Sequence, residues 1–179
     1  MTHSPTAAKS RYLVLHDYGM GGLWWWIRAS SARQIIDTCA EVEVITDPEA
    51  VARAETWSLD EVDIDALSAD PALASLRDKR DGYRHEPGYG ALVGRDRVHL
   101  DMPSEDEDDT RYLVEFGPDG RWLRQVTLTG DGPGTRTDSE NWPINPPIDL
   151  YDPRYVAMEI DVSRFEDAWS RALPAPDDL

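Results

Sequence analysis

Two runs of strand-forming residues flank a glycine-rich stretch near the start of the chain. The first run is RYLVLH at 11–16 and the second is LWWWIRA at 23–29, with glycines at 19, 21 and 22 between them. Two β-prone runs joined by a short glycine-containing loop are typical of a β-hairpin. A hairpin fixes the pairing of two strands at once, so it is the strongest constraint on the fold. We predict an antiparallel strand pair over 11–29.

The second run contains three consecutive tryptophans, which divide between two faces if the run is a strand. Side chains alternate along a strand, so Trp24 and Trp26 point one way while Trp25 and Ile27 point the other. Apolar residues on both faces are typical of a central strand covered on both sides. We therefore predict that most of the tryptophan triplet fills the core.

Capping residues predict three helices in the first half of the chain. Ser30 or Ser31 can cap a helix that runs to about Cys39. Asp-Pro pairs at 47–48 and 70–71 begin two more, because aspartate is a good N-cap and proline suits the first helical position. The third of these helices is expected to end near Asp81, just before a glycine.

The pattern of the second half of the chain predicts an antiparallel meander. Strands are predicted at 97–102, 111–116 and 121–128, and residues 129–149 are predicted to form a packed surface loop. In the first of these strands Val98 and Leu100 alternate with His99, which places His99 on the solvent face.

A last helix is predicted close to the end of the chain. Ser163 and Glu166 have the spacing of a capping box, in which each side chain bonds the other residue's backbone amide. Phe165, Trp169 and Leu173 then line one face of the helix.

These elements predict an α+β fold. We expect a mainly antiparallel sheet, built from the N-terminal hairpin and the C-terminal meander, with three to four helices packed on it. Strands from both ends of the sequence are expected to share this one sheet. The 179-residue length favours a single domain over residues 11–179, preceded by a frayed N-terminus at 1–10.

The charge of the chain limits its partners. It carries 18 basic and 35 acidic side chains, for a formal net charge of −17. Direct nucleic-acid binding needs a basic footprint, and anionic membranes repel such a protein, so neither partner is expected. The absence of a secretory signal and of a long apolar run predicts a cytoplasmic protein. A GC-rich coding background or a salt-adapted proteome would also produce this acidity.

Motifs for chemistry are scarce. The single cysteine, Cys39, lies among apolar residues and is expected to be inert. The sequence contains no HExxH, GxSxG or Walker pattern, and we expect neither a metal nor a cofactor. The alternative hypothesis is a small enzyme or ligand-binding domain. Its pocket would lie beside the hairpin and be lined by His16, Asp17, Tyr18 and a tryptophan.

The positive signal is the placement of acids on two predicted connections, at 58–65 and 104–109. Carboxylates held on loops of a folded scaffold can attract a basic partner, and a partly exposed tryptophan beside them would anchor it. The predicted partner-binding residues are Asp60, Glu61, Asp63, Asp65, Glu105, Asp106, Glu107, Asp108, Asp109, Trp57 and Trp142.

The leading hypothesis is a non-enzymatic acidic domain that binds a basic protein. In general style the chain resembles small bacterial immunity proteins, which are acidic, rich in tryptophan and poor in motifs, although no family motif covers a definable part of it. That resemblance implies an inhibitor that neutralises a basic toxin. The alternatives are the small enzyme or ligand-binding domain described above and a nucleic-acid mimic.

Overall fold

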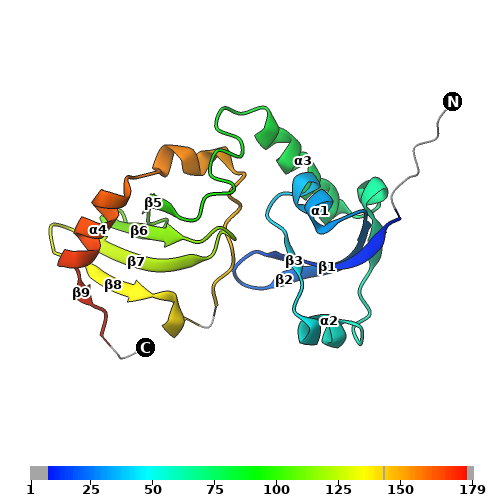
Figure 1. The fold of residues 1–179 in the computed structure, drawn as a ribbon, viewed down its shortest axis with the longest axis horizontal. Helices are drawn as coiled ribbons and strands as arrows, with labels where there is room; N and C mark the ends of the chain where they lie inside the picture. Colours follow the sequence, from blue (N-terminus) through cyan, green and yellow to red (C-terminus); the bar gives the residue numbers. More distant parts are fainter. Residues whose placement is uncertain (1–7, 143, 177–179) are drawn as a thin grey trace. The chain divides into compact units, whose positions relative to one another are not determined.

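The computed structural model describes residues 8–142 and 144–176 and has the predicted α+β fold (Figure 1). The chain divides into two compact units, Met1–His85 and Glu86–Leu179, each with its own sheet and helices. The single domain over 11–179 stays a prediction. Of the segment expected to be frayed, residues 1–7 lie outside the described residues, whereas Ser10 already begins the first strand.

The first unit is built on the predicted hairpin, which is confirmed. Its strands β1 (Ser10–Asp17) and β2 (Gly22–Ala29) pair antiparallel along their full length, from Ser10 opposite Ala29 to Asp17 opposite Gly22. Gly19 adopts φ +86° in the turn, a conformation that favours glycine. The sheet has the order β3-β1-β2-β4, with the short strands β3 (Glu43–Ile45) and β4 (Glu61–Asp63) at its edges.

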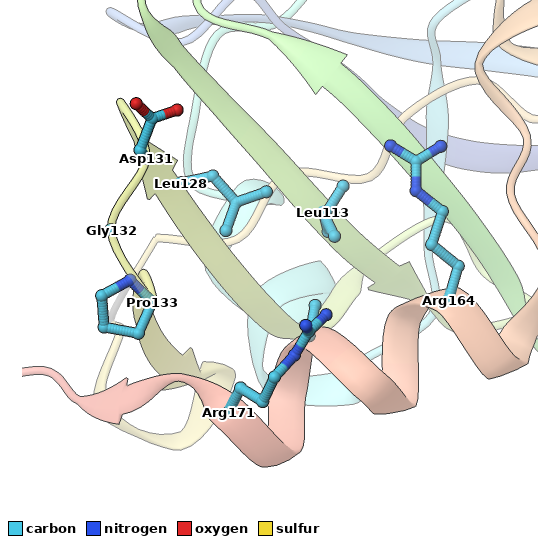
Figure 2. A pocket seen from close by; sticks show the side chains of 8 residues that line it. Leu113, Leu128, Asp131, Gly132, Pro133, Arg164 and Arg171 are labelled. Atoms are coloured by element: carbon cyan, nitrogen blue, oxygen red, sulfur yellow. The ribbon is translucent and has the colours of Figure 1, made fainter.

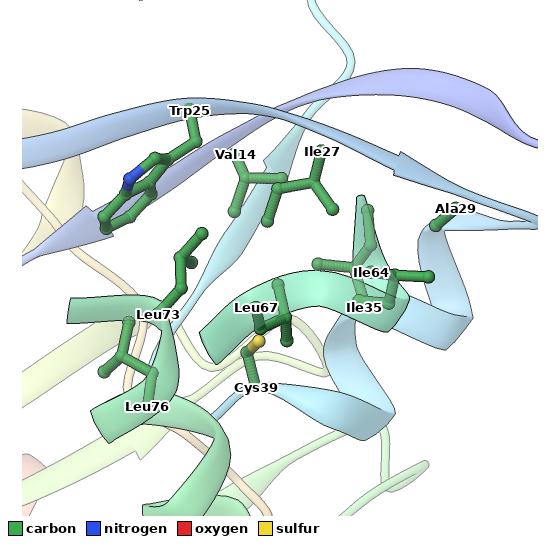
Figure 3. Close-up of a cluster of buried hydrophobic side chains, with 10 residues drawn as sticks. All are labelled: Val14, Trp25, Ile27, Ala29, Ile35, Cys39, Ile64, Leu67, Leu73 and Leu76. Carbon is green, nitrogen blue, oxygen red and sulfur yellow. The ribbon is translucent and has the colours of Figure 1, made fainter. Parts of the chain in front are cut away.

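The tryptophan triplet packs into the core, as predicted, and its side chains contribute to clusters on both faces of the sheet. On one face Trp25 and Ile27 pack into a cluster with helix residues such as Ile35 and Leu73 (Figure 3). On the other face Trp26 packs with β1 and the second helix, and Trp24 lies against this second cluster. Trp25 and Trp26 are only 4% and 5% exposed, so neither can form the floor of an open site.

The three predicted helices of this unit are present: α1 (Ala32–Thr38), α2 (Pro48–Ala54) and α3 (Pro71–Arg84). Ser31, Asp47 and Asp70 cap them by accepting hydrogen bonds from backbone amides of the first turn. Helix α3 continues three residues past the predicted end. A glycine inside a helix costs about 1 kcal/mol, and burial of Arg80 and Tyr83 in the last turns offsets that cost.

The 58–65 stretch, predicted as a connection between regular elements, contains regular structure itself, so that prediction was wrong. Residues 61–63 form β4, parallel to β2, and Ile64–Ala69 forms a 3-10 helix, η1. The backbone amide of Trp26 donates to the carbonyl of Asp60 at 2.9 Å, which aligns the segment with β2. Ile64 and Leu67 are buried in the same cluster as Trp25, so apolar burial holds a stretch that looks polar in sequence.

The second unit contains the predicted meander and two further strands. Its five strands pair in chain order: β5 (Val98–Pro103), β6 (Thr110–Phe116), β7 (Trp122–Thr129), β8 (Thr135–Asp138) and β9 (Leu173–Pro174). The expected surface loop at 129–149 therefore contains a strand, followed by the 3-10 helix η2 (Ser139–Asn141). One face of the sheet packs against residues 148–158, including the 3-10 helix η3 (Pro153–Met158), and α4 (Val162–Arg171) covers the other.

Two further expectations were wrong. The described strands form two sheets and not one shared sheet, because β3 and β4 occupy both edges of the N-terminal hairpin. The capping box is not formed either: Asp161 is the N-cap of α4, and its side chain makes no capping hydrogen bond. The helix ends at Arg171, so Leu173 lies in β9 and is 59% exposed, not on the buried face of a helix.

Candidate functional site

The β5–β6 connection presents five carboxylates to solvent. We call residues 104–109 the acidic loop; its exposed acids are Glu105, Asp106, Glu107, Asp108 and Asp109. No ion pair involves any of these five within the part of the chain that the structure describes. Their negative charges therefore add to one another and are not cancelled locally.

Hydrogen bonds close the base of the acidic loop. The Ser104 amide donates to the Thr110 carbonyl at 2.9 Å, and the Thr110 amide donates to the Glu107 carbonyl at 3.1 Å. The Ser104 hydroxyl accepts from the Glu107 amide at 3.2 Å, and the Thr110 hydroxyl donates to the Glu107 carboxylate at 2.7 Å. The carboxylates thus project from a connection whose backbone is fixed by its own hydrogen bonds.

The acidic loop also contacts the β7–β8 connection, since the Gly130 amide donates to the Asp109 carbonyl at 3.3 Å. This contact adds exposed Asp131 to the same end of the sheet. Among the described residues, no three His, Cys, Asp or Glu side chains come together as a metal site. The acids of the loop are spread over a surface, which suits a macromolecular partner better than a single cation.

The acidic stretch of the first unit is arranged differently, because cations face three of its four acids. Lys9 hydrogen-bonds both Asp63 and Asp65, and its hydrogen bond lowers the pKa of Asp63 while the pKa of Lys9 is raised. A carboxylate oxygen of Glu61 lies 3.6 Å from Arg11 and another lies 4.0 Å from Arg28. Much of the charge predicted to attract a partner is neutralised here within the unit.

The two tryptophans proposed as anchors are partly exposed, and the one in the second unit lies apart from the acidic loop. Trp57 is 39% exposed and packs edge-on against Trp24 in the first unit. Trp142 is 47% exposed and packs edge-on against Trp122 at the start of β7. The acidic loop lies at the other end of β7, where Thr129 pairs with Thr110. A strand of that length spans about 23 Å at about 3.3 Å per residue, so Trp142 does not flank these acids.

The alternative site at the hairpin has its polar groups engaged in local structure. The Nδ1 of His16 lies 2.8 Å from the Glu41 carbonyl oxygen, which can only accept, so Nδ1 donates. The Asp17 carboxylate accepts from the Gly19 amide at 2.8 Å, inside the turn. Tyr18 is 58% exposed, with its ring centre 6.3 Å from that of His16. These contacts orient His16 and Asp17 toward separate backbone partners and not toward each other.

A polar network under α4 was missed by sequence reasoning, and the placement of His99 on the solvent face was wrong. His99 is 8% exposed, and its Nε2 lies 3.0 Å from a Glu115 carboxylate oxygen. Arg124 donates two hydrogen bonds to Glu115, at 2.9 and 2.8 Å, and contacts Glu166 on α4. The face of β5 that carries His99 is buried because α4 crosses it. The Phe165 ring centre on α4 lies 5.0 Å from the His99 ring centre.

The charges of this network stabilise one another. The hydrogen bond from Arg124 holds the pKa of Glu115 below its ordinary value, and the Glu115 and Glu166 carboxylates raise the pKa of Arg124. The Arg124 guanidinium also stacks 4.9 Å from the centre of the Phe165 ring. With its donors and acceptors matched in this way, the network fastens α4 to the sheet.

A pocket of about 470 Å³ lies beside this network, between α4, the strands β6 and β7, and the β7–β8 connection (Figure 2). The residues that line it are Leu113, Leu128, Asp131, Gly132, Pro133, Arg164, Ala168 and Arg171. It belongs to the second unit, whereas the sequence hypothesis placed a pocket beside the hairpin of the first. Its two arginines come from α4 and had no recognisable spacing motif in the sequence.

Cys39 offers no nucleophile, since it is fully buried and burial raises the pKa of its thiol to about 11. Within the described ranges, no helix is both long and apolar enough to cross a bilayer. Comparisons with protein families, with curated proteins and with solved structures found no match to this chain.

Proposed function

We propose that the protein binds a basic protein partner through the acidic loop. The observation that carries the proposal is the contrast in pairing: five exposed carboxylates share one hydrogen-bonded connection and form no ion pair with the described residues. A cationic surface would supply the missing counter-charges. The most concrete form is an inhibitor or immunity-type protein that neutralises a basic toxin in the cytoplasm.

Electrostatics makes the acidic loop effective in the encounter step. A focused field of one sign raises association rates by about 10- to 1,000-fold at low ionic strength, and salt screens it. Because the backbone of the loop is held by hydrogen bonds at its base, its charges need little ordering when a partner docks. Affinity beyond steering would come from apolar and hydrogen-bonding contacts around the loop.

The paired acids of the first unit have a lesser part in this proposal. Glu61, Asp63 and Asp65 face Lys9, Arg11 and Arg28, so a partner would have to displace internal cations to use them fully. Asp60 is exposed and remains a proposed contact residue. Trp57 and Trp142 remain proposed contact residues, since each exposes part of an indole.

The test compares two full-length variants that each lose five negative charges. In one, all five acids of the acidic loop become amides (E105Q, D106N, E107Q, D108N and D109N). In the control, five exposed acids scattered over the second unit are changed in the same way (E86Q, D96N, E140Q, D161N and D167N). The immobilised proteins are exposed to a purified basic probe protein, cytochrome c, and association is followed at 50 and 300 mM salt.

We expect the loop variant to lose at least tenfold in association rate at 50 mM salt, and the control to lose less than threefold. Equal losses in the two variants would show that overall charge, and not the acidic loop, attracts the partner. Capture that is unaffected by either variant or by salt would refute the proposal.

A further inference from the structure

The pocket under α4 combines an apolar floor with a positively charged wall. Leu113 and Ala168, 2% and 7% exposed, form its base together with Leu128. Figure 2 shows Arg164 and Arg171 rising from α4 toward the strands, with Pro133 and the rest of the β7–β8 connection closing the other side. The volume of about 470 Å³ lies within the range of about 300–1,000 Å³ found for small-molecule sites.

The wall opposite α4 is held in place by a close backbone approach. Gly134 has φ +77°, and a Cβ atom there would lie 2.8 Å from both the Leu128 side chain and the Thr127 carbonyl oxygen. Only glycine permits this contact, which holds the 131–133 segment beside Leu128. The Leu173 amide donates to the Gly134 carbonyl at 3.0 Å, which ties the same segment to the chain that leaves α4. The pocket is therefore bounded on both sides by anchored backbone.

The pocket carries more positive than negative charge. Arg171 is exposed and donates through Nε to the Asp167 carbonyl at 3.1 Å, and among the described residues it forms no ion pair. Arg164 shares the buried carboxylate of Asp101 with Arg111, so one acid serves two guanidinium groups. Asp131 is the single acid among the lining residues. The lining residues alone thus carry two positive charges and one negative charge.

We infer that this pocket binds a small organic carboxylate with an apolar body. The planar guanidinium of Arg171 can donate two parallel hydrogen bonds to a carboxylate, an arrangement that is stronger than neutral hydrogen bonding. The apolar body of the ligand would cover Leu113 and Leu128. A cationic ligand would face two arginines and one acid and is disfavoured. The pocket adjoins the acidic loop, because Asp131 lies on the β7–β8 connection that the loop contacts. It is lined by other residues than the acids of the loop, and the inference does not depend on the function proposed for the loop.

The test is calorimetric titration of the full-length protein with two probes, 3-phenylpropionate and octanoate, which distinguish a ring from a chain. The corresponding primary amides keep each body and remove the charge. The variants are R171Q, R171K and, as a matched control, R97Q. Arg97 is another exposed arginine of the second unit, and its guanidinium donates to a backbone carbonyl. Thermal melting establishes that each variant is folded.

At least one carboxylate should bind, and its amide should bind at least tenfold more weakly. R171Q should weaken carboxylate binding about tenfold. R171K should lose less, because lysine keeps the charge but not the fork. R97Q should bind like the unaltered protein. The inference is overturned if neither carboxylate binds at millimolar concentration, if acid and amide bind equally, or if R171Q and R97Q behave alike.

Discussion

The acidic stretch at 60–65 and the acidic loop at 104–109 look alike in sequence, yet the fold treats them differently. In the first, Lys9 joins Asp63 and Asp65, and arginines lie within 4.0 Å of Glu61. In the second, the acids are all exposed and none is ion-paired within the described chain. The lesson is that a surplus of acids becomes a candidate interface only where the fold brings no cation to them.

A third class of acid, buried and ion-paired, can be compared with these two stretches. Removing such an acid should change the free energy of unfolding more than any other change considered. E115Q would leave Arg124 and His99 without their shared carboxylate beneath α4. Breaking a buried pair typically costs about 3–5 kcal/mol. Because the Arg124 side chain is 27% exposed, we expect about 3 kcal/mol of lost unfolding free energy, measured by urea denaturation. The matched variant D108N, in the acidic loop, should change it by less than about 0.5 kcal/mol. Similar losses in the two variants would contradict the assigned difference between paired and unpaired acids.

The next largest effect concerns association with a basic partner. Neutralising Asp63 and Asp65 together should reduce the association rate by less than about threefold, against at least tenfold for the acidic loop. The reason is that Lys9 already cancels part of the charge of those two acids. Stopped-flow measurement at 50 mM salt compares the two variants directly, and a larger loss from the paired acids would reverse our assignment of the interface.

A smaller effect should appear as a pH dependence of stability. The pKa of Glu115 is lowered in the folded protein, so its ion pair stabilises the fold at pH values above the ordinary carboxyl pKa. That contribution is lost as the pH falls through the lowered folded value. The urea midpoint should thus fall as the pH is taken below the ordinary glutamate pKa of about 4.3, and E115Q should show a shallower fall. Parallel curves for the two proteins would exclude Glu115 as a source of the acid sensitivity.

The smallest expected effect comes from removing a cation that pairs with acids, instead of removing the acids themselves. K9Q removes the cation that joins Asp63 and Asp65, so these two acids lose their ion pairs while Glu61 keeps its arginines. Association with a basic partner should then become faster, by about twofold at low salt, because one further negative charge is uncovered. A rate that is unchanged, or slower, would show that the first unit takes no part in the encounter.

The local elements were predictable because their signals lie within a few residues. The runs at 11–16 and 23–29 indicated the hairpin, and aspartate before proline located two helix starts. Strand β8 was missed because its sequence, TRTD, lacks an apolar alternation, and it is held by pairing with β7 and β9.

Long-range relationships decided what the sequence could not show about the candidate sites. Lys9 meets Asp63 across 54 residues, and Arg164 meets Asp101 across 63. His99 was assigned to solvent because its own strand alternates, but the helix that covers it begins at Val162. The two arginines of the pocket lie seven residues apart on α4, a spacing that also suits an exposed helical surface.

The pairing of β8 with β9 has a consequence for how the protein is made. The first unit possesses all of its strands once Asp63 has been synthesised, and its last core helix once Arg84 has followed. The second sheet gains its final strand only at Leu173, which pairs with Thr135. Domains commonly fold from the N-terminus during translation. The first unit can therefore fold on the ribosome before the last strand of the second sheet has been synthesised.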